Sequence, residues 1–339
     1  MAGGIGSRFW PMSTPEKPKQ FLDILGVGRT MIQQTFDRYA GIIDIDHVWV
    51  VTAARYRDMV SEQLPGILPE HILLEPCMRN TAPCLAYAAW KMLAEDRDAL
   101  MMVAASDHLV TDVPAFQAAV RCGFDFIAAG NRILTLGMTP TRPETGYGYI
   151  ESGAEAENGI CAVASFREKP DLKTAESYLS TGRYTWNSGM FLWSAETLIG
   201  EIRHYASSLA SAMDQLIPVF HTPKEQSTVD DIYPALEKIS IDYAVMEHTT
   251  IAYVLPAEFG WSDVGTWGSL HTLIAHDAAD NAIVGDGVKA IDAHRNMIRM
   301  PEGKRVIVEG VDDLIITEHN GTLLVCRLAD EQHIKEWNA

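Results

Sequence analysis

Between residues 30 and 140 the sequence alternates short apolar runs with longer amphipathic segments, and this alternation restricts the fold more than any other feature. It predicts strands at residues 47–52, 71–74, 100–104 and 132–136, and helices at residues 54–64, 81–94 and 113–129. Strands separated by helices of this length are typical of a mainly parallel, doubly wound α/β sheet with helices on both faces. Because ligands bind beyond the carboxyl ends of the strands in such sheets, we expect functional side chains in the loops that follow them.

The pattern changes after residue 140. Two strands are expected close together at residues 147–152 and 160–166, followed by a helix at residues 171–179. The helical stretch from residue 195 to residue 246 contains three prolines, and proline in a helix interior interrupts the helix. We therefore expect several short helices there.

Helical periodicity ends at about residue 280. Short apolar runs then recur at residues 306–308, 314–317 and 323–326, with Gly, Asn and Asp between them. Such runs predict a small β-helix-like domain rather than a second Rossmann-type half. We therefore predict two domains, a catalytic domain over residues 1–280 and a small β-rich domain over residues 281–339.

The composition excludes several classes of protein. The 339 residues carry 27 basic and 45 acidic side chains, a net charge of −18, which argues against binding nucleic acid along a broad basic face. No run approaches the roughly 18 apolar residues of a membrane span, and the N-terminus lacks the pattern of a secretory signal. The five cysteines form no C-x-x-C pair, so neither a disulfide framework nor a zinc site is indicated. We expect a cytoplasmic protein that binds neither nucleic acid nor membranes.

The first chemical site is a basic, glycine-rich loop near the N-terminus. Glycines let the backbone approach an anion and direct N–H groups at it, and prolines then hold the chain extended. The glycines are Gly3, Gly4 and Gly6, the prolines are Pro11, Pro15 and Pro18, and the basic residues are Arg8, Lys17 and Lys19. The loop lacks the Gly-Lys-Ser/Thr of a Walker A loop and the third glycine of the dinucleotide fingerprint. It therefore predicts a polyphosphate cradle of another type.

The combination G-G-x-G-x-R followed by P-K-Q-F-L resembles the signature of the sugar-phosphate nucleotidyltransferases, and its Trp-Pro and Lys-Gln-Phe-Leu forms resemble their guanylyltransferase branch. Further motifs extend the resemblance: E-P-C-M-R-N-T-A at 75–82, A-A-S-D-H at 104–108, E-T-G-Y-G-Y-I at 144–150, F-R-E-K-P at 166–170, W-N-S-G-M-F at 186–191 and G-W-S-D-V-G-T-W at 260–267. The resemblance implies that an oxygen of mannose 1-phosphate attacks the α-phosphorus of GTP, which gives GDP-mannose and pyrophosphate. Such catalysis consists mostly of alignment and charge neutralisation.

The resemblance also assigns roles to charged residues. Asp107 and Asp263 match the two metal-binding aspartates of the family and would hold Mg²⁺, which takes few protein carboxylates and completes its coordination with phosphate and water. Arg8 and Lys19 would stabilise the departing pyrophosphate, and Lys169 would hold the attacking phosphate, so these three are the candidate catalytic residues. Taken alone, either aspartate is more typical of a helix cap or a turn.

The resemblance places the binding site for the sugar phosphate in three motifs, those at 144–150, 166–170 and 186–191. Glu168 would accept hydrogen bonds from sugar hydroxyls beside Lys169, and Asn187 would be a further hydroxyl partner. The backbone of Gly146 would lie close to the sugar, and the side chain of Tyr147 would line one side of the sugar site. Without the resemblance, Glu168 and Lys169 would be a solvated pair and Asn187 a turn residue before a buried strand.

The purine is assigned to the segment of Asn80 and Thr81, although either residue could also be the N-cap of the following helix. The complete set of candidate nucleotide-binding residues is Gly3, Gly4, Gly6, Arg8, Lys19, Asn80, Thr81 and Asp107.

Two other functions stay open. One is transfer to another sugar 1-phosphate or from another nucleotide, and the other is a regulatory homologue that binds nucleotide sugar without catalysis. The second would be expected to lack the loop charges and the metal ligands, whereas Arg8, Lys19, Asp107 and Asp263 are all present. We also expect a homodimer, paired through the β-rich segment.

Both ends of the chain bear on the resemblance. The family places a buried strand directly before the glycine loop, but here Met1 and Ala2 alone precede Gly3, so the strand lies upstream or another strand takes its place.

The segment from residue 281 to residue 339 is too short for the isomerase domain that is fused to some members of the family. We therefore expect no mannose-6-phosphate isomerase activity.

Overall fold

The computed structural model describes residues 1–337. Contacts divide the chain into two compact units. Among the described residues, the larger unit comprises residues 1–3, 38–105 and 110–261, and the smaller unit comprises residues 4–37, 106–109 and 262–337. The glycine-rich loop therefore groups with the C-terminal segment. The domain boundary at residue 280 stays a prediction about which parts fold independently.

A six-stranded sheet in the order β3-β8-β5-β9-β7-β6 forms the centre of the larger unit. Its strands are β3 Leu100–Val103, β5 Ile133–Met138, β6 Tyr149–Glu157, β7 Ile160–Arg167, β8 Tyr184–Ser194 and β9 Ala252–Ala257. The strands β5 and β9 are parallel, whereas β8 runs antiparallel to β3, β5 and β6, and β7 runs antiparallel to β6 and β9. The expectation of a mainly parallel sheet is thus corrected to a mixed sheet, because β8 lies between β3 and β5 and runs antiparallel to both.

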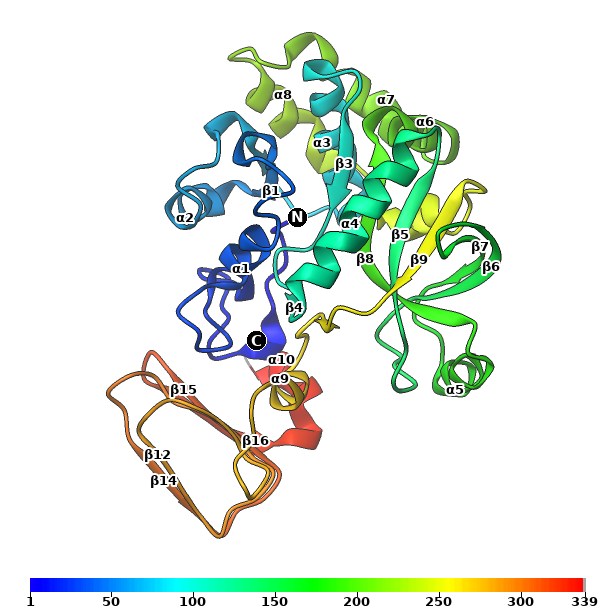
Figure 1. Cartoon of the computed structure of the whole chain (residues 1–339). Coiled ribbons are helices and arrows are strands. Elements are labelled where there is room, and N and C mark those ends of the chain that lie inside the picture. Colours follow the sequence, from blue (N-terminus) through cyan, green and yellow to red (C-terminus); the bar gives the residue numbers. More distant parts are fainter. Residues whose placement is uncertain (338–339) are drawn as a thin grey trace. The chain divides into compact units, whose positions relative to one another are not determined.

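Helices cover both faces of this sheet (Figure 1). The alternation of side chains along β8 shows why both faces are apolar: Phe191 and Trp193 belong to the core under α3 and α6, while Met190 and Leu192 belong to the core under α4. The α-helices of this unit are α2 Arg57–Gln63, α3 Thr81–Glu95, α4 Val113–Ala128, α5 Leu172–Thr181, α6 Ala195–Tyr205, α7 Ser207–Asp214 and α8 Glu225–Ile232. A π-helix, η8, spans Asp242–Met246. The expected series of short helices over residues 195–246 is confirmed.

The strands β1 Val50–Ala53 and β2 Ile72–Glu75 form a separate parallel pair in the larger unit. Ala2 continues this pair, since its N–H donates to the Val51 carbonyl at 2.8 Å and its own carbonyl accepts from Thr52 Oγ1 at 2.9 Å. Ala2 therefore lies beside β1. Ala2 directly precedes the glycine-rich loop, the position in which the resemblance implies a buried strand.

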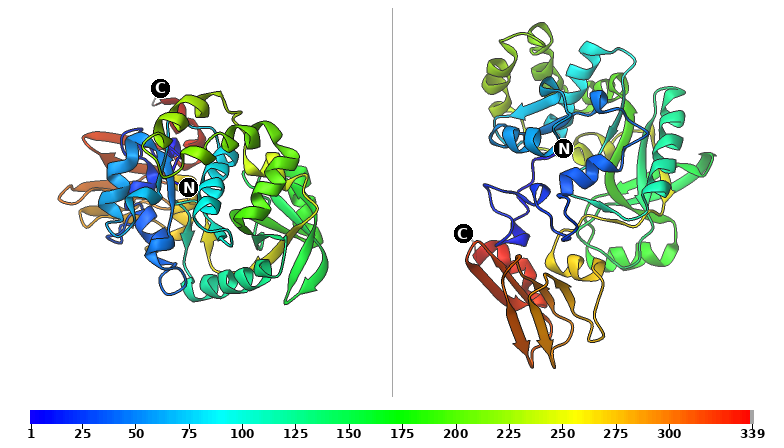
Figure 2. Two further views of the ribbon diagram at one scale, coloured as in Figure 1. Left: turned by 90° about the horizontal axis from the view of Figure 1, so that it is seen from above. Right: turned by 60° about the vertical axis from the view of Figure 1, so that its left-hand side comes forward.

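The smaller unit combines the glycine-rich loop with the β-rich segment. Its four-stranded sheet contains β11 Ala282–Val284, β13 Met297–Arg299, β15 Leu314–His319 and β16 Thr322–Arg327, and β12 Val288–Ile291 pairs in parallel with β14 Val306–Glu309. The colours of Figure 2 show this β-rich segment in orange to red. Its helices include α1 Met31–Asp37, α9 Trp267–Leu273 and α10 Ile334–Trp337. The chain passes between the units within β4 Leu109–Val110 and β10 Trp261–Ser262. The fold is thus mixed α/β with a small C-terminal β-sheet region.

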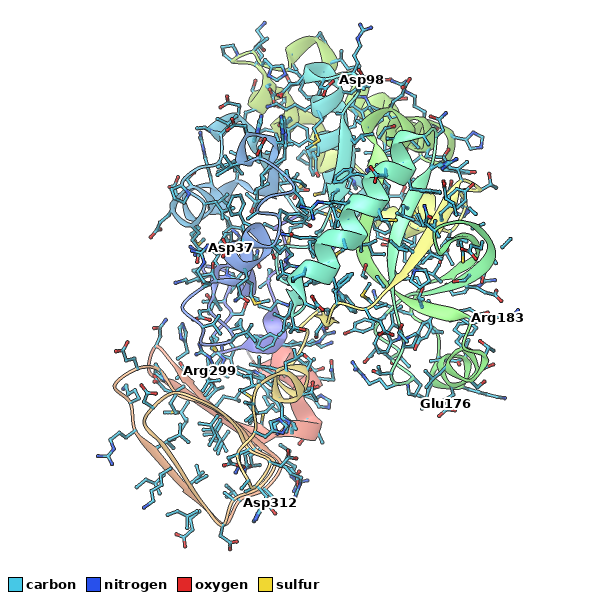
Figure 3. All side chains as sticks on the ribbon, viewed as in Figure 1. Asp37, Asp98, Glu176, Arg183, Arg299 and Asp312 are labelled. Atoms are coloured by element: carbon cyan, nitrogen blue, oxygen red, sulfur yellow. The ribbon has the colours of Figure 1, made fainter. Side chains whose placement is uncertain are left out.

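One apolar core holds the glycine-rich loop against the β-rich segment. Phe9 packs on Trp267 with ring centroids 5.1 Å apart, and Met297 and Ile315 belong to the same fully buried cluster. Arg299, which Figure 3 labels, donates from Nη2 to the carbonyl of Asp23 at 2.6 Å. The loop that carries the candidate phosphate ligands is therefore fixed by residues more than 250 positions away in sequence.

Candidate active site

Lys19 is a buried cation at the centre of the smaller unit, with an exposed fraction of 4%. Its Nζ atom lies 3.0 Å from Oδ2 of Asp107 and donates to the main-chain carbonyls of Asp263 and Val264 at 2.8 and 3.0 Å. An ammonium group has three donors. Lys19 therefore binds three protein oxygens and joins the glycine-rich loop to both candidate metal ligands.

Gly6 allows this arrangement. Its φ angle is +63°, and a Cβ atom at this position would lie 2.7 Å from Cβ of Lys19 and 3.1 Å from Oγ of Ser13. Residue 6 must therefore be glycine for both conformation and space. Of the three loop glycines, Gly6 has the positive φ angle; Gly3 belongs to the larger unit, and a Cβ at Gly4 would meet no atom within 4 Å.

The turn at Asp263 is held in an unusual conformation. Val264 has a φ angle of +45°, which is rare for a β-branched residue, and Lys19 binds its carbonyl oxygen. The N–H of Gly265 donates to Oδ1 of Asp263 at 3.0 Å, and a Cβ at Gly265 would lie 2.8 Å from Oδ2 of the same carboxylate. Strained backbone of this kind persists only where surrounding contacts impose it, and it clusters at functional sites.

Asp107 stays ionised in this environment. Burial acts to raise its pKa, but the positive charges of Lys19 and His108 and the hydrogen bond from Lys19 together hold the pKa below its usual value. The side chain keeps 29% of its surface exposed. An anionic oxygen group is thus held at the edge of the glycine-rich loop.

The candidate metal ligands are the carboxylates of Asp107 and Asp263. Asp107 and Asp263 supply carboxylate oxygens, the ligands that Mg²⁺ prefers, and Lys19 contacts both residues. Among residues 1–337, no group of three or more His, Cys, Asp or Glu side chains could hold a metal ion. Two aspartates alone leave most coordination positions of such an ion to other ligands.

Arg8 differs from Lys19 in its surroundings. It lies on the short 3₁₀ helix η1, Ser7–Phe9, and is exposed. It forms no ion pair within the part of the chain that the structure describes. Its guanidinium is thus available to an anionic ligand, whereas Lys19 is already occupied.

The candidate sugar residues gather in the larger unit around Glu168. Oε1 of Glu168 pairs with Nζ of Lys169 at 3.0 Å, while Oε2 is buried and has no hydrogen-bond partner among the described residues. Burial acts to lower the pKa of Lys169, but the hydrogen bond and charge of Glu168 raise it. A Cβ atom at Gly148 would collide with Oε2 of Glu168 and lie 3.2 Å from Cβ of Asn187. Glycine at this position therefore leaves space beside an unsatisfied acceptor.

Asn187 has its amide orientation fixed by two neighbours. Its Oδ1 accepts from the N–H of Gly189 at 3.0 Å, and its Nδ2 donates to Oδ1 of Asp242 at 2.8 Å. Burial, and then the negative charge of Glu168, raise the pKa of Asp242 to about 6. Asp242 and Gly148 were not among the residues predicted from the sequence. The available signal for Asp242 was a carboxylate inside the apolar run from residue 239 to residue 246.

Gly146 and Tyr147 lie in the loop before β6. The N–H of Gly146 donates to Oε1 of Glu144 at 2.9 Å. The ring of Tyr147 packs edge-on against Trp186 and Trp261, with centroids 5.3 and 5.2 Å apart. Tyr147 is thus held by aromatic contacts near β8, the strand that carries Asn187.

Asn80 and Thr81 have structural roles at the start of α3. Asn80, with a φ angle of +69°, is the N-cap, and its Oδ1 accepts from the N–H of Thr81 at 2.8 Å. Oγ1 of Thr81 accepts from the N–H of Ile241 at 2.9 Å, and the N–H of Ala82 donates to the Ile239 carbonyl at 3.1 Å. The capping alternative is therefore confirmed for Asn80, and contact of either residue with a base stays a prediction.

We expect Gly6→Ala to lower the kcat/KM of the enzyme by at least about tenfold, because the new methyl displaces Lys19 from its three oxygens. A positive φ alone costs roughly 1–2 kcal/mol for an alanine. Gly28→Ala isolates that cost, since Gly28 also has a positive φ but open space around its Cβ position. Steady-state kinetics should show near-native turnover for Gly28→Ala. Equal losses in the two variants would show that contact with Lys19 is unimportant.

The mixed α/β fold and the basic glycine-rich loop define a class of phosphate-binding enzymes. Residues 1–280 match the family model described as nucleotidyl transferase. The chain belongs to the nucleotidyl transferase family.

Curated relatives extend this similarity along the chain. Mannose-1-phosphate guanylyltransferase RfbM of Salmonella typhimurium is 40% identical over 341 residues, which cover 99% of this chain and 70% of the relative. Mannose-1-phosphate guanylyltransferase of Escherichia coli K12 is 39% identical over 345 residues, 99% of this chain and 71% of the relative. A solved structure from Thermus thermophilus, described as a mannose-1-phosphate geranyltransferase, has a TM-score of 0.91 and 30% identity, and covers 100% of this chain and 96% of its own.

Within residues 1–337, no helix combines the length and the apolar character needed to cross a bilayer.

Proposed function

We propose that this chain transfers GMP from GTP to α-D-mannose 1-phosphate, which gives GDP-mannose and pyrophosphate. One observation carries the proposal: Lys19 joins the glycine-rich loop to Asp107 and to the Asp263 turn, three parts of the sequence that the guanylyltransferase resemblance assigns to one reaction. The names of relatives that are about 40% identical over 99% of the chain support the choice of GTP and mannose 1-phosphate.

The proposed reaction needs no side-chain nucleophile. A phosphate oxygen of mannose 1-phosphate forms a bond to the α-phosphorus of GTP, and the bond from that phosphorus to the bridging oxygen breaks, so pyrophosphate leaves with this oxygen. The protein then contributes alignment and charge neutralisation. Mg²⁺, held by Asp107 and Asp263, would supply positive charge to the reacting phosphates.

The geometry sharpens the roles of the basic residues. Exposed Arg8 would bind the departing pyrophosphate. Lys19 already binds three protein oxygens, so we propose that it acts mainly by positioning Asp107 and the Asp263 turn. Lys169 would hold the attacking phosphate, while Glu168 and Asn187 would contact the sugar hydroxyls. Gly3, Gly4 and Gly6 would approach the triphosphate of GTP.

A pyrophosphate-release assay tests this function. The purified chain is given Mg²⁺, each of the four common nucleoside triphosphates, and a panel of hexose 1-phosphates. We expect the highest kcat/KM with GTP and mannose 1-phosphate. A higher value with another pair would reassign the substrate, and release with no pair would contradict transferase activity.

Three further features belong to this proposal. The β-rich segment is proposed to be β-helix-like, supported by the parallel pairing of β11, β13 and β15 beside the parallel pair of β12 and β14. A homodimer and a cytoplasmic location stay predictions. Size-exclusion chromatography with light scattering would test the first.

A further inference from the structure

Asp242 connects a residue assigned to the sugar, Asn187, with the segment assigned to the purine, which contains Thr81. Its carboxylate accepts from Asn187, while the segment directly before it is tied to the start of α3, where Thr81 Oγ1 accepts from the N–H of Ile241. Residue 242 also begins the π-helix η8. π-Helical turns are rare and occur frequently at functional sites.

Two carboxylates lie near one another here. Asp242 accepts hydrogen bonds from Asn187, Ser240 and its own N–H, whereas Glu168 is less well satisfied. Glu168 is near enough for its charge to raise the pKa of Asp242. Among the described residues, Lys169 pairs with one carboxylate oxygen of Glu168, and the second oxygen of Glu168 has no hydrogen-bond partner. A neutral ligand with several hydroxyl groups would supply the missing donors, because ionised carboxylates only accept hydrogen bonds.

We propose that Asp242 is a specificity-determining residue that binds hydroxyl groups of the sugar 1-phosphate together with Glu168 and Asn187. This inference rests on the proposed function and extends it to a residue that the sequence motifs did not identify. Asn187 is oriented by Gly189 and Asp242, and its Nδ2 keeps a second N–H that can donate to a ligand. The absence of a side chain at Gly148 provides space next to Glu168. Adjacent acceptors at fixed positions select a hexose by the directions of its hydroxyls, since a missing partner leaves a buried polar group unpaired.

The test separates sugar binding from nucleotide binding. Asp242→Asn keeps the size of the side chain and an acceptor for Asn187 but removes the charge. Glu247→Gln is the matched control, because Glu247 directly follows η8, is exposed and loses the same charge. The KM values for mannose 1-phosphate and GTP and the kcat are measured by pyrophosphate release. KM does not depend on the fraction of folded enzyme, so partial misfolding of a variant does not spoil the comparison.

We expect Asp242→Asn to raise the KM for mannose 1-phosphate by at least about tenfold, equivalent to about 1.4 kcal/mol, and to change the KM for GTP by less than about twofold. The preference for mannose 1-phosphate over glucose 1-phosphate, which differs at C2, should fall as well. Glu247→Gln should match the wild type. Equal changes in both KM values, or no change in either, would overturn the inference.

The pH dependence of ligand binding gives a second readout that a purely structural role would not move. GDP-mannose is the probe, because its diphosphate does not titrate near neutrality. The groups that face Asp242 are Glu168 and Lys169, and Tyr243 stands beside it. Because the pKa of Asp242 is about 6, the affinity of the wild type should rise as the pH increases through about 6, and that of Asp242→Asn should not.

The wild-type measurements keep the two hypotheses distinct. If the wild type uses another sugar 1-phosphate, the proposed substrate fails, and the same comparison of variants is made with that sugar. If the wild type is active and Asp242→Asn behaves like Glu247→Gln, the proposed function stands and the role of Asp242 is refuted.

Discussion

Lys19→Ala should lower kcat/KM for pyrophosphate release by at least about 10²-fold, the loss that is typical when one preorganised charge-stabilising group is removed. The reason is the position of the ammonium, which binds Asp107 and the carbonyls of Asp263 and Val264 within 3.0 Å. Without it, Asp107 loses its counter-ion and the strained turn at Val264 loses a contact that holds it. The measurement is steady-state kinetics at saturating Mg²⁺.

Lys304→Ala provides the matched control, since Lys304 carries the same charge in the same smaller unit but is exposed and lies outside the glycine-rich loop. We expect Lys304→Ala to stay within about twofold of the wild type, as is usual for surface substitutions. A Mg²⁺ titration then separates the two roles considered for Lys19. A positioning role predicts a higher Mg²⁺ requirement in Lys19→Ala, whereas direct binding of pyrophosphate predicts weaker product inhibition with an unchanged Mg²⁺ requirement. Near-native turnover of Lys19→Ala would contradict both roles.

The helices of the larger unit could be located from the sequence because local signals determine them. Helix α4 was expected at residues 113–129 and spans Val113–Ala128, with Asp112 as N-cap and a proline in its first turn. Strong apolar periodicity and a capping residue coincide here. The antiparallel direction of β8 could not be predicted from local signals, because it depends on which distant strands pair with β8. The two-residue turn Asn158-Gly159, both with positive φ, was a usable signal for the antiparallel β6–β7 hairpin.

Local sequence patterns also could not predict that the glycine-rich loop packs with the C-terminal segment. Glycines, prolines and lysines predicted an extended phosphate-binding arm, and the loop does carry Lys19 toward Asp107. Phe9, Met12 and Ile24 are nevertheless fully or almost fully buried, so the loop is a packed part of the smaller unit. Large apolar residues inside a loop indicate that the loop is packed, but they do not indicate which segment it packs against. The partner, Trp267, lies in the motif of Asp263, so this packing brings the two motifs together in the structure.

Asp107→Asn is the second variant for which we expect a loss of at least about 10²-fold in kcat/KM. Asparagine keeps the shape of the side chain but neither neutralises Lys19 nor offers Mg²⁺ an anionic oxygen. The concentration of Mg²⁺ that gives half-maximal activity should therefore rise. Asp286→Asn is the control, because Asp286 is an exposed aspartate of the same smaller unit.

The pH dependence of stability gives this variant a readout besides activity. The pKa of folded Asp107 is lowered by Lys19 against the opposing effect of burial, so its stabilising contribution is fully present above the unfolded value of about 3.9. This contribution is lost as the pH falls through the lower, folded value. Urea denaturation should therefore show a constant difference in unfolding free energy between wild type and Asp107→Asn from pH 6 to pH 8 that shrinks only in acid, below about pH 4. A difference that disappeared near neutral pH would mean that Lys19 does not hold Asp107 ionised, and the assignment of Asp107 as a metal ligand would lose its electrostatic basis.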